Sequence, residues 1–119
     1  MTLDPQVLAQ ARRWYWQRIS AMVLALCVLV HLITMILAVR GGLTAAEILG
    51  RTQGSLAFAG FYTVFVLACA VHVPIGLATI AREWGRLGER AALWLARGVA
   101  GVMLVLGLRA VWAVYTAGA

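Results

Sequence analysis

The chain of 119 residues contains two histidines, His31 and His72, and both lie inside long apolar runs. An imidazole in the interior of a membrane is costly without a partner, so such a residue marks a functional site or a hydrogen bond that holds two helices together. Neutral imidazoles also serve as axial ligands of haem iron. The two residues therefore indicate either a haem site or polar packing between helices.

The apolar runs around the histidines are long enough to cross a membrane. A transmembrane helix needs about 20 mostly apolar residues, and three segments meet this requirement: 19–39, 55–81 and 91–115. Hydrophobic residues make up 64% of the chain and charged residues 12%, against about 45–50% and about 25% in soluble domains. We therefore expect an all-α integral membrane protein, a single domain over residues 1–119 with three transmembrane helices in an up-down-up bundle.

The ten basic residues are all arginines, and they flank the apolar runs instead of forming one soluble basic surface. This distribution argues against nucleic-acid binding and favours a protein in contact with lipid. Because basic residues are enriched in cytoplasmic loops, the amino terminus and the second loop are expected in the cytoplasm. The six arginines that support this orientation precede the first span or separate the second and third: Arg12, Arg13, Arg18, Arg82, Arg86 and Arg90.

The flanking arginines also give a depth for each histidine. His31 follows Arg18 by 13 residues, and His72 precedes Arg82 by 10. At 1.5 Å per residue these spacings place the histidines about 20 Å and about 15 Å from the same side of the membrane. On antiparallel neighbouring helices, imidazoles at similar depth can occupy both axial positions of one b-type haem. The spacing therefore predicts His31 and His72 as the two ligands of a single haem.

Other residues in the spans fit a haem site. Ala68 and Gly76 lie one helical turn on either side of His72, where small residues leave room for a flat ring. Arg109, deep in the third span, is predicted to pair with a haem propionate or with a partner subunit. The alternative for Arg109 is a side chain that reaches the outer interface. Cys27 and Cys69 have no metal-site spacing and are expected to act as small apolar residues.

Two short motifs resemble the signatures of succinate dehydrogenase cytochrome b subunits. The segment 17–21 is similar to the motif HR-x-[ST]-G: Arg18 and Ser20 match, while Gln17 and Ala21 replace the histidine and the glycine.

The second span is similar to the family's other motif, H-x3-G-x-R-[H/W]-x3-D. His72 and Gly76 match, and Glu83 supplies the acidic residue. Ala78 and Thr79 stand where the arginine and the aromatic residue are expected. The length, the three spans and the orientation agree as well.

This resemblance implies a membrane anchor of succinate dehydrogenase or fumarate reductase in a bacterial inner membrane. Such an anchor is not catalytic alone. A flavoprotein subunit and an iron–sulfur subunit dock on its cytoplasmic side, and electrons pass to ubiquinone or menaquinone. The resemblance implies haem b ligation by His72 and a quinone contact by Arg18.

The family's three-span anchors take the two haem ligands from the second spans of two subunits. The additional His31 leaves three arrangements open: this chain ligates one haem alone, His72 pairs with a partner's histidine, or two haems are shared with a second anchor subunit.

Three residues at the start of the first span, Trp16, Arg18 and Ser20, are the candidates for quinone binding. A guanidinium and a hydroxyl can donate to a quinone carbonyl, and Trp16 can form one wall of the head-group site. Ser20 lies about 200° around the helix from Arg18, so Arg18 is favoured. The alternative is an arginine that only marks the membrane boundary and a serine with no role.

Two other functions remain open. One is a haem b anchor of a different quinone-linked oxidoreductase, such as a hydrogenase or a formate dehydrogenase. The other is a structural membrane subunit whose histidines form hydrogen bonds between helices.

Overall fold

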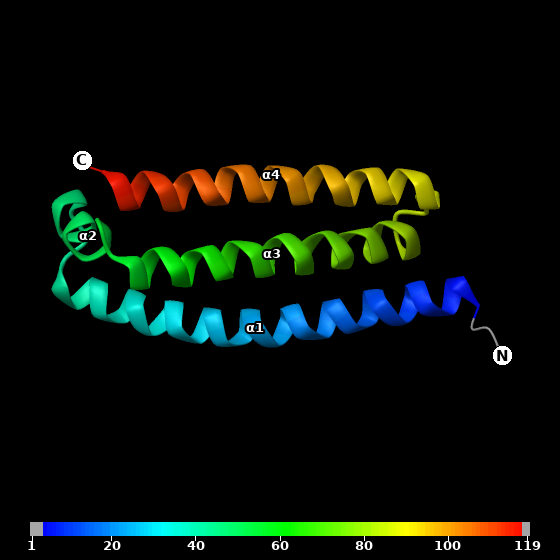
Figure 1. Ribbon diagram of the computed structural model, residues 1–119, viewed down its shortest axis with the longest axis horizontal. Coiled ribbons are helices and arrows are strands. Elements are labelled where there is room, and N and C mark those ends of the chain that lie inside the picture. Colours follow the sequence, from blue (N-terminus) through cyan, green and yellow to red (C-terminus); the bar gives the residue numbers. More distant parts are fainter. Residues whose placement is uncertain (1–3, 118–119) are drawn as a thin grey trace.

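The computed structural model describes residues 4–117, which form three long helices and one short one. The long helices are α1 (Pro5–Gly41), α3 (Leu56–Glu83) and α4 (Glu89–Thr116), and each is long and apolar enough to cross a membrane. The prediction of an all-α architecture with three spans is thus confirmed, and the chain is a multi-pass membrane protein. α3 lies between α1 and α4 and runs antiparallel to both (Figure 1).

α1 begins well before the predicted span. The Asp4 side chain accepts a hydrogen bond from the backbone N–H of Gln6 at 2.9 Å, and Pro5 occupies the first helical position. Both features favour helix initiation, because Asp is a good N-cap and proline suits the first turn. The helix therefore starts 14 residues before Ile19, about 21 Å at 1.5 Å per residue.

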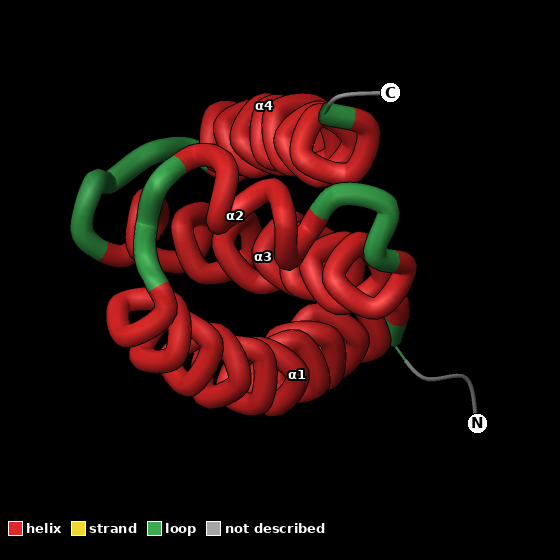
Figure 2. Tube along the Cα trace, turned by 90° about the vertical axis from the view of Figure 1, so that its left-hand side faces the viewer, coloured by secondary structure: helices red, strands yellow, loops and turns green. Residues whose placement is uncertain are grey.

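The connection between α1 and α3 contains a short helix. α2 (Ala45–Thr52) begins with a capping box, in which the Thr44 side chain accepts from the Glu47 N–H and the Glu47 carboxylate accepts from Thr44. Hydrogen bonds from Thr44 hold the pKa of the Glu47 carboxyl below its usual value. The box is therefore present at neutral pH and is lost as the pH falls and Glu47 becomes protonated. α2 covers one end of α3 and α4 (Figure 2), which we call the α2 end.

Small residues form the contacts between the long helices. Among the residues that the structure describes, no large side chain is completely buried. Without a hydrophobic driving force, membrane helices associate by close approach at small side chains. The buried positions follow this rule: Ser20, Cys27, Ala38, Ala68, Ala70, Pro74, Ala78, Ala81 and Ala92.

α4 packs closely against α3 at Gly107. A Cβ atom at this position would lie 2.6 Å from Cγ1 and 2.8 Å from Cγ2 of Val66. Since valine has little rotational freedom in a helix, the Gly107→Ala variant should force the helices apart and destabilise the chain by about 1–3 kcal/mol. Gly60→Ala is the matched control, because its Cβ position has no neighbour within 4 Å in the described part of the chain, apart from the backbone of its own helix. Thermal unfolding in detergent should show a lower midpoint for Gly107→Ala alone.

Glu89 connects all three long helices at the other end of the bundle, which we call the arginine-rich end. Its Oε1 lies 3.3 Å from Arg13 Nη1 of α1 and 3.1 Å from Arg82 Nη1 of α3. The Glu89 side chain is 66% exposed, so each pair adds at most about 1 kcal/mol. The main consequence of the two pairs is the register of α1 against α3, because they hold Arg13 and Arg82 at the same level.

Candidate functional site

A polar cavity of about 420 Å³ lies between α1 and α3 at the arginine-rich end. α1 contributes Trp14, Gln17 and Arg18 to its lining, and α3 contributes Thr79. Arg18, which the sequence singles out for quinone binding, therefore lies at a real cavity. The hydroxyl of Thr79 donates to the Ile75 carbonyl at 3.0 Å, which leaves its oxygen free to accept.

Arg18 is the cation of this cavity that has no carboxylate partner among the described residues. Arg13 and Arg82 also line the cavity, but both are paired with Glu89. The Arg18 guanidinium instead lies 5.3 Å from the centre of the Trp14 ring. A cation–π contact of this kind orients the guanidinium without neutralising its charge. Arg18 thus remains able to bind an anionic or carbonyl oxygen.

Gln17 lies between the cavity and the core of the helix pair. Its Oε1 is buried and has no hydrogen-bond partner among residues 4–117, a state that costs about 1–3 kcal/mol for a polar atom. Its Nε2 would be 3.2 Å from a Cβ at position 76, so Gly76 is required for the close packing of Gln17. The sequence reading assigns Gly76 to haem packing, and the structure gives it this different neighbour.

Ser20 and His72 meet one turn deeper in the bundle. The Ser20 hydroxyl donates to the carbonyls of Trp16 at 2.7 Å and Gln17 at 3.1 Å, and its oxygen is 3.4 Å from His72 Nδ1. Because the hydroxyl proton is directed at the backbone, the serine oxygen can only accept from the ring. In the tautomer that suits this contact, His72 carries its proton at Nδ1, and Nε2 has the lone pair that can bind a metal.

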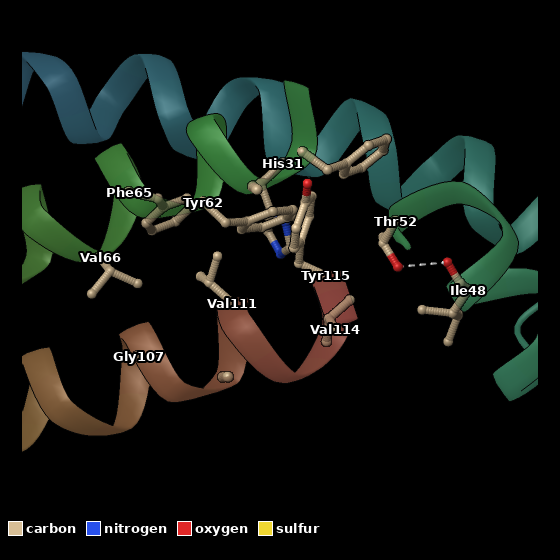
Figure 3. A pocket seen from close by; sticks show the side chains of 13 residues that line it. His31, Ile48, Thr52, Tyr62, Phe65, Val66, Gly107, Val111, Val114 and Tyr115 are labelled. Atoms are coloured by element: carbon tan, nitrogen blue, oxygen red, sulfur yellow. Dashed lines mark hydrogen bonds between the residues drawn. The ribbon is translucent and has the colours of Figure 1, made fainter. Parts of the chain in front are cut away.

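His31 has a different partner, Tyr62, whose hydroxyl oxygen lies 3.1 Å from His31 Nδ1. The imidazole also contacts the rings of Tyr62 and Phe65 edge to face, with centres 5.9 Å and 5.8 Å away. This group lines an apolar cavity of about 410 Å³ near the α2 end. Figure 3 shows His31 reaching from α1 toward these α3 rings, with Val111 of α4 across the cavity.

The structure does not bring His31 and His72 together, so the prediction of similar depth is wrong. His72 lies opposite Ser20, and Ser20 and His31 are 11 residues apart on α1, about 16 Å along the helix. Two axial nitrogens of one metal ion lie about 4 Å apart, because metal–imidazole bonds are about 2 Å long. One haem therefore cannot take both ligands from this arrangement.

The error comes from the reference point. The predicted depth of His31 is measured from Arg18, but Arg13 is the residue level with Arg82, since both contact Glu89. Five residues of helix correspond to about 7.5 Å. Measured from Arg13, His31 lies 18 residues into the bundle, whereas His72 lies 10 residues from Arg82.

The structure also gives the surroundings of four other residues that the sequence predicts to belong to a site. Trp16 is exposed and packs against Tyr15, and Trp14 lines the cavity in its stead. Ser20 is buried against His72 and is absent from the cavity lining. Ala68 is buried in α3. Arg109 is exposed on the side of α4 that faces away from the His31 cavity, so it is not placed to meet a propionate there.

The residues that sequence reasoning missed are Trp14, Thr79 and Tyr62. Trp14 precedes Arg18 by four residues, and this spacing is a signal of a shared helix face. Tyr62 carried no such signal, because its pairing with His31 depends on the register of α1 and α3. No protein-family model, curated protein or solved structure matches this chain.

Proposed function

We propose that this chain is the membrane anchor of a succinate:quinone oxidoreductase, either a succinate dehydrogenase or a quinol:fumarate reductase. In this proposal it passes electrons between a peripheral iron–sulfur subunit and a quinone in a cytoplasmic membrane. The carrying observation is the polar cavity at the arginine-rich end, where Arg18 lies two residues from Ser20, the partner of His72. The resemblance of segments 17–21 and 72–83 to the succinate dehydrogenase motifs supports the same function.

The cavity offers the groups that a quinone head group needs in both redox states. Arg18 can donate to a quinone carbonyl and stabilise the negative charge that develops on it during reduction. The Thr79 hydroxyl oxygen can accept from a hydroxyl group of the reduced form. The arginine-rich end is also the side on which the flavoprotein and iron–sulfur subunits would dock, with the amino terminus in the cytoplasm.

The imidazoles of His31 and His72 fit the ligation of haem b, but at two depths in the bundle instead of one. Each imidazole has its Nδ1 next to a hydroxyl, Ser20 for His72 and Tyr62 for His31. A ligating histidine is ordinarily oriented by a hydrogen bond at its other ring nitrogen in this way. His72 and His31 would each supply one axial ligand to a separate haem, and a second anchor subunit would supply the other. Such haems carry single electrons.

One alternative is supported by the same contacts. A structural subunit would use His31 and His72 as polar contacts between α1 and α3, which both hydrogen bonds allow. Assays of the complex, purified from the membranes in which the chain occurs, distinguish the quinone-linked anchor from the structural subunit. The proposal expects succinate- or fumarate-linked quinone activity and the absorption bands of low-spin haem b after dithionite reduction. A pure complex without haem, or without an iron–sulfur subunit, would overturn it.

The two hydroxyls should affect haem retention selectively. Removing a group that orients a metal ligand lowers affinity about 10- to 100-fold. We therefore expect Ser20→Ala to weaken the haem at His72 and Tyr62→Phe to weaken the haem at His31. The measurement is the haem left after repeated dilution and concentration of the purified complex. Thr34→Ala is the control, because the Thr34 hydroxyl donates to the Val30 carbonyl of its own helix. Equal losses in all three variants would contradict the assignment.

A further inference from the structure

The polar cavity at the arginine-rich end carries a surplus of positive charge. Three guanidinium groups line it, those of Arg13, Arg18 and Arg82. Glu89 is the single acidic residue among the described residues of this lining, and one oxygen of its carboxylate, Oε1, contacts both Arg13 and Arg82. Three positive charges against one negative charge leave a surplus of two. A quinone head group is neutral, so the proposed function does not account for this surplus.

α4 gives the depth of the cavity in the membrane. Glu89 and Arg109 are 20 residues apart on this helix, about 30 Å along its axis, which is the thickness of the hydrocarbon layer. The two residues therefore mark the two surfaces of that layer. Since Glu89 contacts Arg13 and Arg82, both arginines lie at the surface on the arginine-rich end.

The cavity crosses this surface. Its lining on α1 extends from Gln10 to Arg18, three residues before and five residues after Arg13. At 1.5 Å per residue, the cavity reaches about 4.5 Å outside the hydrocarbon layer and about 7.5 Å into it. The polar headgroups lie directly outside the hydrocarbon layer. The outer part of the cavity is therefore at the depth of the lipid phosphates.

The side chain of Arg18 reaches toward the same depth. In a helix each Cα–Cβ bond is tilted toward the amino-terminal end, and α1 begins at the arginine-rich end (Figure 1). The Arg18 guanidinium lies 5.3 Å from the centre of the Trp14 ring, which is one turn nearer that end. A guanidinium has five N–H donors. Arg18 can thus bind a phosphate oxygen in the outer part of the cavity and still donate to a quinone carbonyl deeper in it.

We propose that the outer part of the polar cavity binds the phosphate group of an anionic phospholipid, with Arg13, Arg18 and Arg82 as the donors. Guanidinium groups form strong charge-assisted hydrogen bonds with phosphate oxygens. An anionic headgroup such as that of phosphatidylglycerol offsets part of the positive surplus. The headgroup of phosphatidylcholine carries its own cation, which would lie among the three guanidinium groups.

A free phosphate ion offers the same oxygens, but it is less suited to this position. The phosphate of a lipid is held at this depth by its acyl chains, whereas a free ion would have to leave water to enter the cavity. The inference goes beyond the proposed function and uses neither haem nor quinone. Its test measures lipid binding, so a complex without quinone activity would overturn the proposed function and leave this site unaffected.

The test is a lipid titration of the purified full chain in a neutral detergent. Phosphatidylglycerol or phosphatidylcholine is added, and native mass spectrometry counts the bound lipids and gives the Kd of the first one. We expect phosphatidylglycerol to bind at least about fivefold more tightly, because each arginine near anionic lipid contributes about this factor. Inorganic phosphate at the same concentration as the lipid should not displace it.

Two variants separate the effect of charge from an effect on structure. Arg13→Gln and Glu89→Gln both break the same ion pair, but the first lowers the positive surplus and the second raises it. We therefore expect Arg13→Gln to raise the Kd for phosphatidylglycerol about fivefold and Glu89→Gln to lower it by a similar factor. Arg12→Gln is the matched control, because Arg12 is the neighbouring exposed arginine of α1 and is absent from the cavity lining.

Four results would overturn the proposal. The first is an equal Kd for the two lipids, and the second is displacement of phosphatidylglycerol by an equal concentration of inorganic phosphate. The third is a change of Kd in the same direction in Arg13→Gln and Glu89→Gln, which would reflect loss of the ion pair instead of charge. The fourth is an effect of Arg12→Gln as large as that of Arg13→Gln, which would show general attraction of lipid to the arginine-rich end.

Discussion

Replacing Arg18 with leucine should lower quinone reduction by the assembled complex about 100-fold and leave electron transfer to a soluble acceptor unchanged. The reason is local: Arg18 is the cation of the polar cavity without a carboxylate partner among the described residues, whereas Arg13 and Arg82 are held by Glu89. Loss of one fixed charge beside a developing oxyanion costs about 2.7 kcal/mol of transition-state stabilisation. The measurement is a pair of steady-state assays, one with a soluble quinone analogue and one with a dye that accepts electrons before the membrane.

Arg40→Leu is the matched control for this experiment. Arg40 is also an exposed arginine of α1, but it lies in the last turn, at the α2 end. Its removal should change neither assay. If Arg18→Leu keeps full quinone activity, or loses both activities together, Arg18 has no specific role at the quinone and only marks the membrane boundary.

Each histidine variant should remove one of two haems. The distance of about 16 Å along α1 between Ser20, which marks the level of His72, and His31 excludes a shared iron. His72→Ala should therefore halve the haem content and His31→Ala should remove the other half, because one axial ligand is lost in each case. The measurement is the haem content per complex, determined as the pyridine haemochrome, together with a redox titration that resolves two components.

The redox titration also separates the alternatives. In His72→Ala the component that remains should titrate as it does in the unmodified complex, and the same should hold for the other component in His31→Ala. Complete loss of haem in both variants would indicate one shared site, in conflict with the geometry. Full retention in His31→Ala would show that the Tyr62–His31 pair serves helix packing only.

The sequence was sufficient for the elements that depend on local composition. Three apolar segments with arginines at their ends specify three membrane helices whatever their neighbours are. The separation of Arg18 from Ser20 likewise follows from helical geometry: the structure places Arg18 at the cavity and Ser20 against His72. The short α2 was also within reach, because Thr44 and Glu47 form a recognisable capping box.

The depth of the histidines could not be read in the same way. It depends on how far α1 slides along α3, and that register is set by tertiary contacts: Glu89 with two arginines, Gln17 against Gly76, and Tyr62 with His31. None of these contacts is visible as a local pattern. Measuring from Arg18 instead of Arg13 shifts the depth of His31 by five residues, about 7.5 Å, which brings it to within about one turn of the depth of His72.

The order of the helices, with α3 between α1 and α4, has a mechanical consequence. Three helices packed as a triangle have three interfaces. Here the helices lie in a row and depend mainly on two interfaces, α1–α3 and α3–α4 (Figures 1 and 2). In the described part of the chain, α1 and α4 are therefore each held mainly by their contacts with α3. A movement of α1 against α3 would change the width of the polar cavity and would break the Arg13–Glu89 pair between α1 and α4. Collective motions of this kind take microseconds to milliseconds, a timescale on which a bound head group can enter and leave.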